Sequence, residues 1–111
     1  MQFLNQNLLL KACQQKTQAF QSIKRLIRDG WNINTKNKMR ENALHIVCQF
    51  QNHDESFEIV KYLTQEGIKV NDKNQMRETA LHIACQFQKQ PNLLNIMEYL
   101  IQKGLDINAT K

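Results

Sequence analysis

The sequence is poor in residues that break regular structure and has no run long enough to cross a membrane. Its 111 residues include three glycines and one proline. No stretch approaches the roughly 18 consecutive apolar residues of a transmembrane helix, so no membrane span is expected. The N-terminus has no basic segment followed by a long apolar one, which argues against a secretory signal. Glycine-rich phosphate-binding loops are missing too, so nucleotide binding has no scaffold.

Long runs of one charge are also absent. The net charge is +5 and the pI is about 9.3, but lysine and arginine are interleaved with aspartate and glutamate throughout. Nucleic-acid-binding surfaces usually cluster their basic residues. Binding to nucleic acid is therefore the less favoured interpretation, and a generally basic, soluble surface is the simpler one.

What the sequence does contain is an internal repeat. The strings at residues 39–50 and 76–87 are nearly identical, and the second starts 37 residues after the first. Gly30, Gly67 and Gly104 keep the same spacing of 37 residues. A fixed period of this size indicates stacked supersecondary units, and such arrays usually bind partners.

Each unit is predicted to hold two helices. The first helices are expected over residues 8–16, 43–52 and 80–89, because apolar residues there follow polar residues suited to capping. Those predicted N-caps are Asn7, Asn42 and Thr79.

The second helices are expected at Phe20–Ile27, Phe57–Leu63 and Leu94–Ile101, where apolar residues recur at helical spacing. The three spaced glycines should close them as C-caps. The connectors that follow alternate apolar and polar residues before Asn, Asp and Lys, which predicts short hairpins.

These pieces resemble the ankyrin repeat. The matching segments are Thr79–Ala84 for the capping turn and first helix, Glu58–Leu63 for the second helix and Gly67–Asn71 for the loop. The resemblance covers essentially the whole chain. It implies an all-α, ankyrin-type helix-turn-helix/β-hairpin solenoid, with residues 1–111 as one domain. The repeat units would be residues 5–34, 35–71 and 72–108.

The sequence departs from the family pattern in two places. Arg40 and Arg77 stand where the family has a loop glycine, and because arginine does not easily adopt a positive φ, the hairpin tips are expected to bend differently. The usual period is 33 residues, so each full unit carries four extra residues. They fall between the two helices and predict a longer first helix, a longer inter-helix loop, or both.

Cysteine and histidine at equivalent positions raise the possibility of disulfides, a metal site or catalysis. Equivalent atoms of packed repeats should lie roughly 8–10 Å apart, too far for a disulfide or shared metal ligation. Cys13, Cys48 and Cys85 are therefore interpreted as small buried thiols, which favours a reducing, cytoplasmic compartment, without excluding the nucleus. His45 and His82 are interpreted as supports of the capping turn. No catalytic set can be assembled, and no enzyme activity, metal or cofactor is expected.

By resemblance, the hairpin tips and the adjoining face of the first helices form the concave, partner-binding surface. Met39 and Met76 are expected to be exposed there. Phe50 and Phe87 are either groove anchors or covered by the inserted turn, and the second alternative is favoured. The implied positions are Lys36, Lys38, Met39, Arg40, Glu41, Gln49 and Phe50 in one unit, and Lys73, Gln75, Met76, Arg77, Glu78, Gln86 and Phe87 in the next.

The resulting prediction is a non-catalytic protein-interaction module, with an acidic protein surface as a reasonable partner. Alternatives are a regulatory segment attached to an enzyme, a scaffold subunit of a larger assembly, or a bacterial effector. The first and last helices are apolar, whereas terminal units of a solenoid need polar outer faces. We therefore expect that more protein continues the array, or that an end packs on a partner or on another copy.

Overall fold

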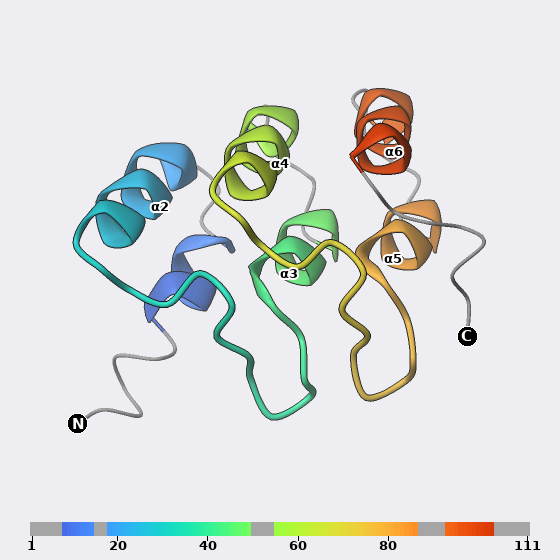
Figure 1. The fold of residues 1–111 in the computed structure, drawn as a ribbon, viewed down its shortest axis with the longest axis horizontal. Coiled ribbons are helices and arrows are strands. Elements are labelled where there is room, and N and C mark those ends of the chain that lie inside the picture. The colour runs from blue at the N-terminus through green and yellow to red at the C-terminus, as the bar shows by residue number, and fades with distance from the viewer. Residues whose placement is uncertain (1–7, 15–17, 50–54, 87–92, 104–111) are drawn as a thin grey trace.

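The computed structural model describes residues 8–14, 18–49, 55–86 and 93–103. Its helices form two layers (Figure 1). The inner layer comprises the helical residues 8–12, α3 (Ala43–Gln49) and α5 (Ala80–Gln86), and the outer layer comprises α2 (Ala19–Arg28), α4 (Ser56–Gln65) and α6 (Leu93–Gln102). Helix α3 packs against α4 and α5, and α6 packs against α4 and α5. The predicted stack of three helix pairs is confirmed.

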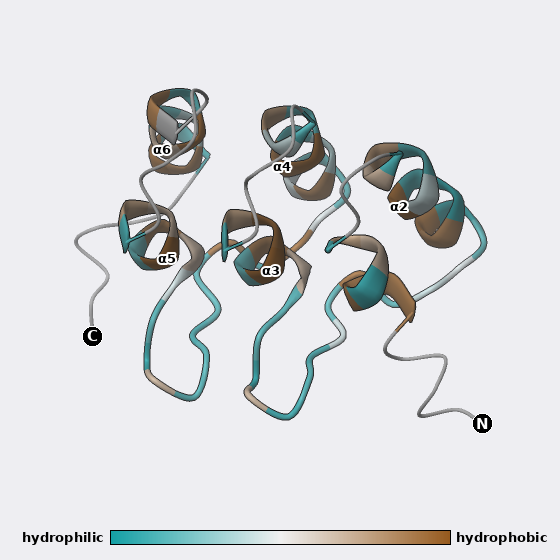
Figure 2. Ribbon diagram, turned by 180° about the vertical axis from the view of Figure 1, so that it is seen from behind, coloured by the Kyte–Doolittle hydropathy of each residue, from teal (hydrophilic) through white to brown (hydrophobic). Residues whose placement is uncertain are grey.

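The core lies between and along the two layers. Apolar residues concentrate on the helices, whereas the connecting loops are mainly hydrophilic (Figure 2). Small residues such as Ala43, Val47 and Ala84 are fully buried in the inner layer, which allows neighbouring helices to approach closely. The largest fully buried apolar side chains are Leu9, Ile23, Leu44, Ile59, Leu63, Ile96 and Leu100.

Asn42 and Thr79 cap the inner helices α3 and α5, as the sequence predicts. The backbone N–H of His45 donates to Asn42 Oδ1 at 3.0 Å, and the backbone N–H of His82 donates to Thr79 Oγ1 at 3.4 Å. Each cap supplies an acceptor to a backbone N–H in the first turn of its helix. The third predicted cap, Asn7, lies outside the described residues.

Gly30 and Gly67 close the outer helices α2 and α4. Both have a φ of 99°, which places them in the left-handed region that favours glycine. After α4, Gly67 N–H donates to the Thr64 carbonyl at 3.2 Å and Ile68 N–H donates to the Leu63 carbonyl at 3.1 Å. This pair of bonds is a Schellman motif, so the predicted glycine C-caps are confirmed at these two positions. Gly104 lies outside the described residues.

The outer helices agree with their predicted lengths, whereas the first inner helix is shorter than predicted. The outer helices contain the expected segments and extend slightly beyond them. The helix expected over residues 8–16 ends at Ala12, because the chain tightens into a turn in which Gln14 N–H donates to the Lys11 carbonyl at 3.0 Å. The ends predicted for the other two inner helices, and the four extra residues of each unit, fall at residues 50–54 and 87–92, outside the described residues.

Aromatic contacts join successive outer helices. Phe20 of α2 meets Tyr62 of α4 edge to face, with ring centroids 5.7 Å apart. Phe57 of α4 meets Tyr99 of α6 in the same way at 6.0 Å. The Tyr99 hydroxyl also lies 3.1 Å from Thr64 Oγ1. The same contact therefore recurs one unit later, which matches the 37-residue period of the sequence.

Candidate interaction surface

The loop before α3 forms a tight tip that is held by the side chain of Asn37. Asn37 Oδ1 accepts hydrogen bonds from the backbone N–H groups of Met39 and Glu41, each at 2.9 Å. The Asn37 carbonyl accepts the N–H of Arg40 at 2.9 Å, and the Asn37 N–H donates to the Glu41 carbonyl at 3.1 Å. The tip conformation thus depends on one asparagine and on backbone atoms.

The loop before α5 repeats this arrangement around Asn74. Asn74 Oδ1 accepts the N–H groups of Met76 and Glu78 at 2.9 Å, and its carbonyl accepts the N–H of Arg77 at 2.9 Å. Asn37 and Asn74 were missed as functional positions in the sequence. The signal that could have revealed them is an asparagine followed four residues later by glutamate, in both units.

The expectation that the tips bend differently because of their arginines is wrong. Arg40 has a φ of 63° and Arg77 a φ of 65°, so both occupy the left-handed conformation expected of the family's glycine. An L-residue in this region costs roughly 1–2 kcal/mol relative to the right-handed conformation. The hydrogen bonds of Asn37 and Asn74 hold the loop backbone in this conformation, so Arg40 and Arg77 adopt a positive φ despite its cost.

The tips project methionine and basic side chains into solvent. Met39 is 48% exposed and Met76 is 68% exposed, as predicted. Arg40 and Arg77 are exposed beside them. Lys38, Lys73 and Gln75 are exposed as well.

Two contacts fix the spacing between neighbouring tips. The backbone N–H of Gln75 donates to the carbonyl of Met39 at 2.8 Å. At the base of the loops, Lys36 Nζ lies 3.4 Å from Asp72 Oδ2. Lys36 is therefore engaged in an ion pair between units, and its charge is partly neutralised there.

Glu41, Glu78 and two glutamines lie behind the tips. Glu78 accepts a hydrogen bond from Asn74 Nδ2 at 3.1 Å and one from Gln86 Nε2 at 2.7 Å, and these bonds lower the pKa of its carboxyl group. Glu41 accepts from Asn37 Nδ2 at 2.9 Å in the first loop. Gln86 is exposed, whereas Gln49 is half-buried. Phe50 and Phe87 lie outside the described residues, so both alternatives for them remain predictions.

His45 supports the structure, as predicted, and also links two units. Its Nδ1 accepts the backbone N–H of Asn42 at 3.1 Å, and its Nε2 lies 2.9 Å from the carbonyl of Glu78. A carbonyl can only accept, so Nε2 carries the proton. Burial lowers the pKa of His45, which keeps the imidazole neutral.

The three cysteines are thiols and not disulfides. Cys13 and Cys48 are fully buried, and burial raises the pKa of both, to about 12 for Cys48. In the parts of the chain that the structure describes, no three His, Cys, Asp or Glu side chains are grouped so as to hold a metal ion. The same residues contain no helix long and apolar enough to cross a membrane.

The family is decided by a match over almost the whole length of the sequence. The model for ankyrin repeats matches residues 9–111 in three copies. The chain belongs to the ankyrin-repeat family. Curated proteins give no match, so the family is the level at which relatives inform its function.

Membership in the ankyrin family explains the arrangement of the surface. Ankyrin repeats are generally protein-interaction modules and are typically non-catalytic. In this ankyrin array the structure brings together the tip residues of both loops and, behind them, Glu41 and Glu78. It separates Lys36 from that exposed group by pairing it with Asp72.

Proposed function

We propose that this ankyrin array binds a protein partner through its two loop tips and the adjoining face of α3 and α5, without catalysis of its own. The observation that carries the proposal is the pair of left-handed arginines, Arg40 and Arg77. Glycine would occupy the same backbone conformation without strain. In both tips, a long basic side chain therefore occupies an exposed position with a strained backbone, which lowers stability. A role in recognising a protein partner would explain why arginine stands there in place of glycine.

The neighbouring methionines support the same proposal. Met39 and Met76 are large, flexible apolar side chains in solvent, held at a fixed spacing by the bond between the two loops. Methionine and arginine are both enriched at protein interfaces, and exposed apolar side chains gain from burial there. Two such pairs side by side offer two equivalent contacts to one partner.

The charge of the tips favours an acidic partner. Lys38, Arg40, Lys73 and Arg77 are exposed at or near the tips, and none of them has an ion pair within the described residues. Lys36 is omitted from this group because it pairs with Asp72. Complementary charge would mainly accelerate association and make binding sensitive to salt. A reducing compartment, such as the cytoplasm, fits the three thiols of the chain.

The test removes the two tip arginines without disturbing the loops. The variant Arg40→Gly/Arg77→Gly suits the left-handed backbone, so the tips should keep their shape. The matched control, Arg25→Gln/Arg28→Gln, also removes two positive charges, from exposed positions of α2. Each immobilised protein is exposed to the same lysate, and the retained proteins are quantified by mass spectrometry. The strongest candidate is then purified and its Kd measured at two salt concentrations.

We expect one set of proteins to be retained by the wild type and by the α2 control but lost from the tip variant. The purified partner should bind more weakly at higher salt. Equal retention and equal Kd for the wild type and the tip variant would refute the role of the tips.

A further inference from the structure

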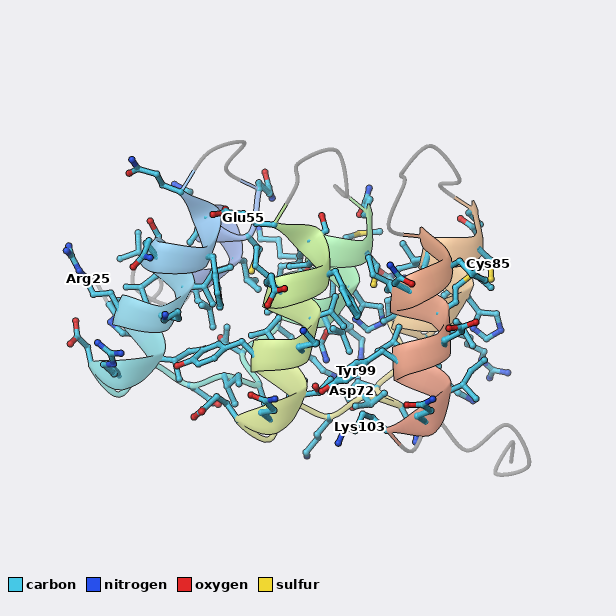
Figure 3. All side chains as sticks on the ribbon, turned by 90° about the horizontal axis from the view of Figure 1, so that it is seen from above. Arg25, Glu55, Asp72, Cys85, Tyr99 and Lys103 are labelled. Carbon is cyan, nitrogen blue, oxygen red and sulfur yellow. The ribbon has the colours of Figure 1, made fainter. Side chains whose placement is uncertain are left out.

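Each of the outer helices α4 and α6 contacts the outer helix before it through a tyrosine. Tyr62 of α4 receives Phe20 of the preceding helix, and Tyr99 of α6 receives Phe57. Each tyrosine follows a fully buried isoleucine by three residues, which places both side chains on one face of the helix. Tyr99 lies between α4 and α6 (Figure 3). The tyrosine is thus the residue by which α4 and α6 each contact the preceding outer helix, and a buried isoleucine lies on the same helix face, in an Ile-x-x-Tyr pair.

In α6, the positions equivalent to those that contact the next outer helix are exposed to solvent. Leu94 and Ile101 occupy the positions 37 residues after Phe57 and Thr64, the two residues that contact Tyr99. Leu94 is 64% exposed and Ile101 is 44% exposed. Leu94 and Ile101 thus form an exposed apolar surface on α6, at the place where α2 and α4 each pack on a tyrosine of the next outer helix.

The inner layer shows the same difference between internal and terminal positions. His45 is 1% exposed and bonds the Glu78 carbonyl of the next unit. Its equivalent, His82, is exposed, and within the described residues its hydrogen bonds are all to Thr79. Leu44 is buried, whereas its equivalent Leu81 is half-buried. We call the surface formed by Leu81, His82, Leu94, Met97 and Ile101 the α5–α6 edge.

The opposite edge, at α2, does not complement this surface. Ser22 and Arg25 stand 37 residues before Ile59 and Tyr62, so a serine and an arginine replace the Ile-x-x-Tyr pair. Both residues line two open hollows of about 410 and 390 Å³ on that side of the molecule. Arg25 points away from the body of the molecule (Figure 3). A second copy stacking by its α2 would therefore bring a cation against Leu94 and Ile101.

We propose that the α5–α6 edge is a docking surface for a further ankyrin-type helix pair, distinct from a second copy of this chain. The outer helix of that pair carries Ile-x-x-Tyr, whose tyrosine packs on Leu94 and Ile101. The loop before the next inner helix presents a backbone carbonyl to His82 Nε2, as Glu78 does to His45. The proposal rests on the contacts between units and is independent of the function proposed for the tips.

The test adds one more unit to the chain, in register with the 37-residue repeat, and varies only the Ile-x-x-Tyr pair of the added unit. Residues 104–110 correspond in sequence to residues 67–73, so a copy of residues 74–103 placed after Thr110, in place of Lys111, completes a further unit that includes the loop asparagine. In the matched control, the copies of Ile96 and Tyr99 are changed to the serine and arginine found in α2. Urea denaturation and hydrogen exchange of α6 are measured for the original chain and for both extensions.

The Ile-x-x-Tyr extension should raise the urea midpoint and slow amide exchange in α6, and the Ser/Arg extension should do so much less. Leu94→Asp should abolish this gain in the extended chain and leave the midpoint of the original chain nearly unchanged, because Leu94 is exposed there. Equal midpoints for the two extensions would overturn the proposal. So would sedimentation equilibrium showing a dimer of the original chain that Leu94→Asp dissociates, since the occupant would then be a second copy.

Discussion

The imidazole of His45 bonds the backbone carbonyl of Glu78, in the next unit, at 2.9 Å. Its other ring nitrogen accepts the N–H of Asn42, at the start of its own helix. One side chain therefore joins the cap of α3 to the loop that precedes α5. His82 has the same local bonds to Thr79 but is exposed, so the two histidines form a natural matched pair.

Replacing His45 should be far more damaging than replacing His82. His45→Ala leaves a buried N–H and a carbonyl without their partners and opens a cavity, with an expected loss of roughly 2–4 kcal/mol. His82→Ala, at an exposed site, should cost about 1 kcal/mol or less. Urea denaturation at neutral pH measures both. Similar losses for the two variants would show that the bond to Glu78 contributes little.

Stability should fall as pH is lowered through the range in which free histidine titrates. The pKa of His45 is lowered by burial from an ordinary value of 6.5, so the folded state binds fewer protons than the unfolded state in this range. The contribution of this difference is therefore fully present above about pH 6.5 and is lost as pH decreases, with a slope of at most about 1.4 kcal/mol per pH unit.

The free energy of unfolding, measured between neutral pH and pH 5, tests this dependence. His45→Gln, which cannot titrate, should flatten the profile. The lowered pKa of Glu78 acts at lower pH, below the ordinary value of 4.5, and leaves this window undisturbed. A profile of unchanged slope in His45→Gln would assign the pH dependence to other groups.

Glycine at the tips should not destabilise the protein. Arg77→Gly removes a left-handed strain of roughly 1–2 kcal/mol, offset by about 0.5–1 kcal/mol of extra chain entropy in the unfolded state. The net change should lie between zero and a gain of about 1.5 kcal/mol, seen as an equal or higher urea midpoint. Arg77→Val should be destabilising instead, because a β-branched residue tolerates positive φ poorly. If glycine lowered stability as much as valine, the arginine side chain would have a structural role.

The three thiols should react in a fixed order. Cys85 is half-buried, whereas Cys13 and Cys48 are fully buried and have raised pKa values, about 12 for Cys48. Because the thiolate is the reactive form, a disulfide reagent at pH 8 should modify Cys85 first and the other two only on unfolding. Cys85→Ser should eliminate the early phase of the reaction. An early phase that persists in this variant would require exposure of Cys13 or Cys48 by local opening.

The repeat period made most of the fold predictable from sequence. Helix starts at Asn42 and Thr79 and helix ends at Gly30 and Gly67 depend on local backbone chemistry, which the residue types reveal. The exposure of Met39 and Met76 followed from their place after the apolar alternation ends.

Features that depend on specific hydrogen bonds and ion pairs, and not on residue type alone, were predicted less well. The positive φ of Arg40 is imposed by Asn37, which holds the loop through five hydrogen bonds, and residue preference alone gave the opposite expectation. The pairing of Lys36 with Asp72 joins residues of different units, so the family resemblance, which placed Lys36 among the partner-binding positions, did not reveal it. The early end of the first helix likewise reflects a local tightening that its apolar pattern does not signal.

Because asparagine side chains hold the two loops, the loop conformation does not depend on the side chains exposed at the tips. Asn37 and Asn74 hold their loops through backbone N–H and C=O groups, and through a glutamate four residues on. The side chains at positions 38 and 39, or 75 and 76, take no part in these bonds. These positions can therefore be exchanged in evolution, or in a designed library, while the scaffold that presents them stays the same.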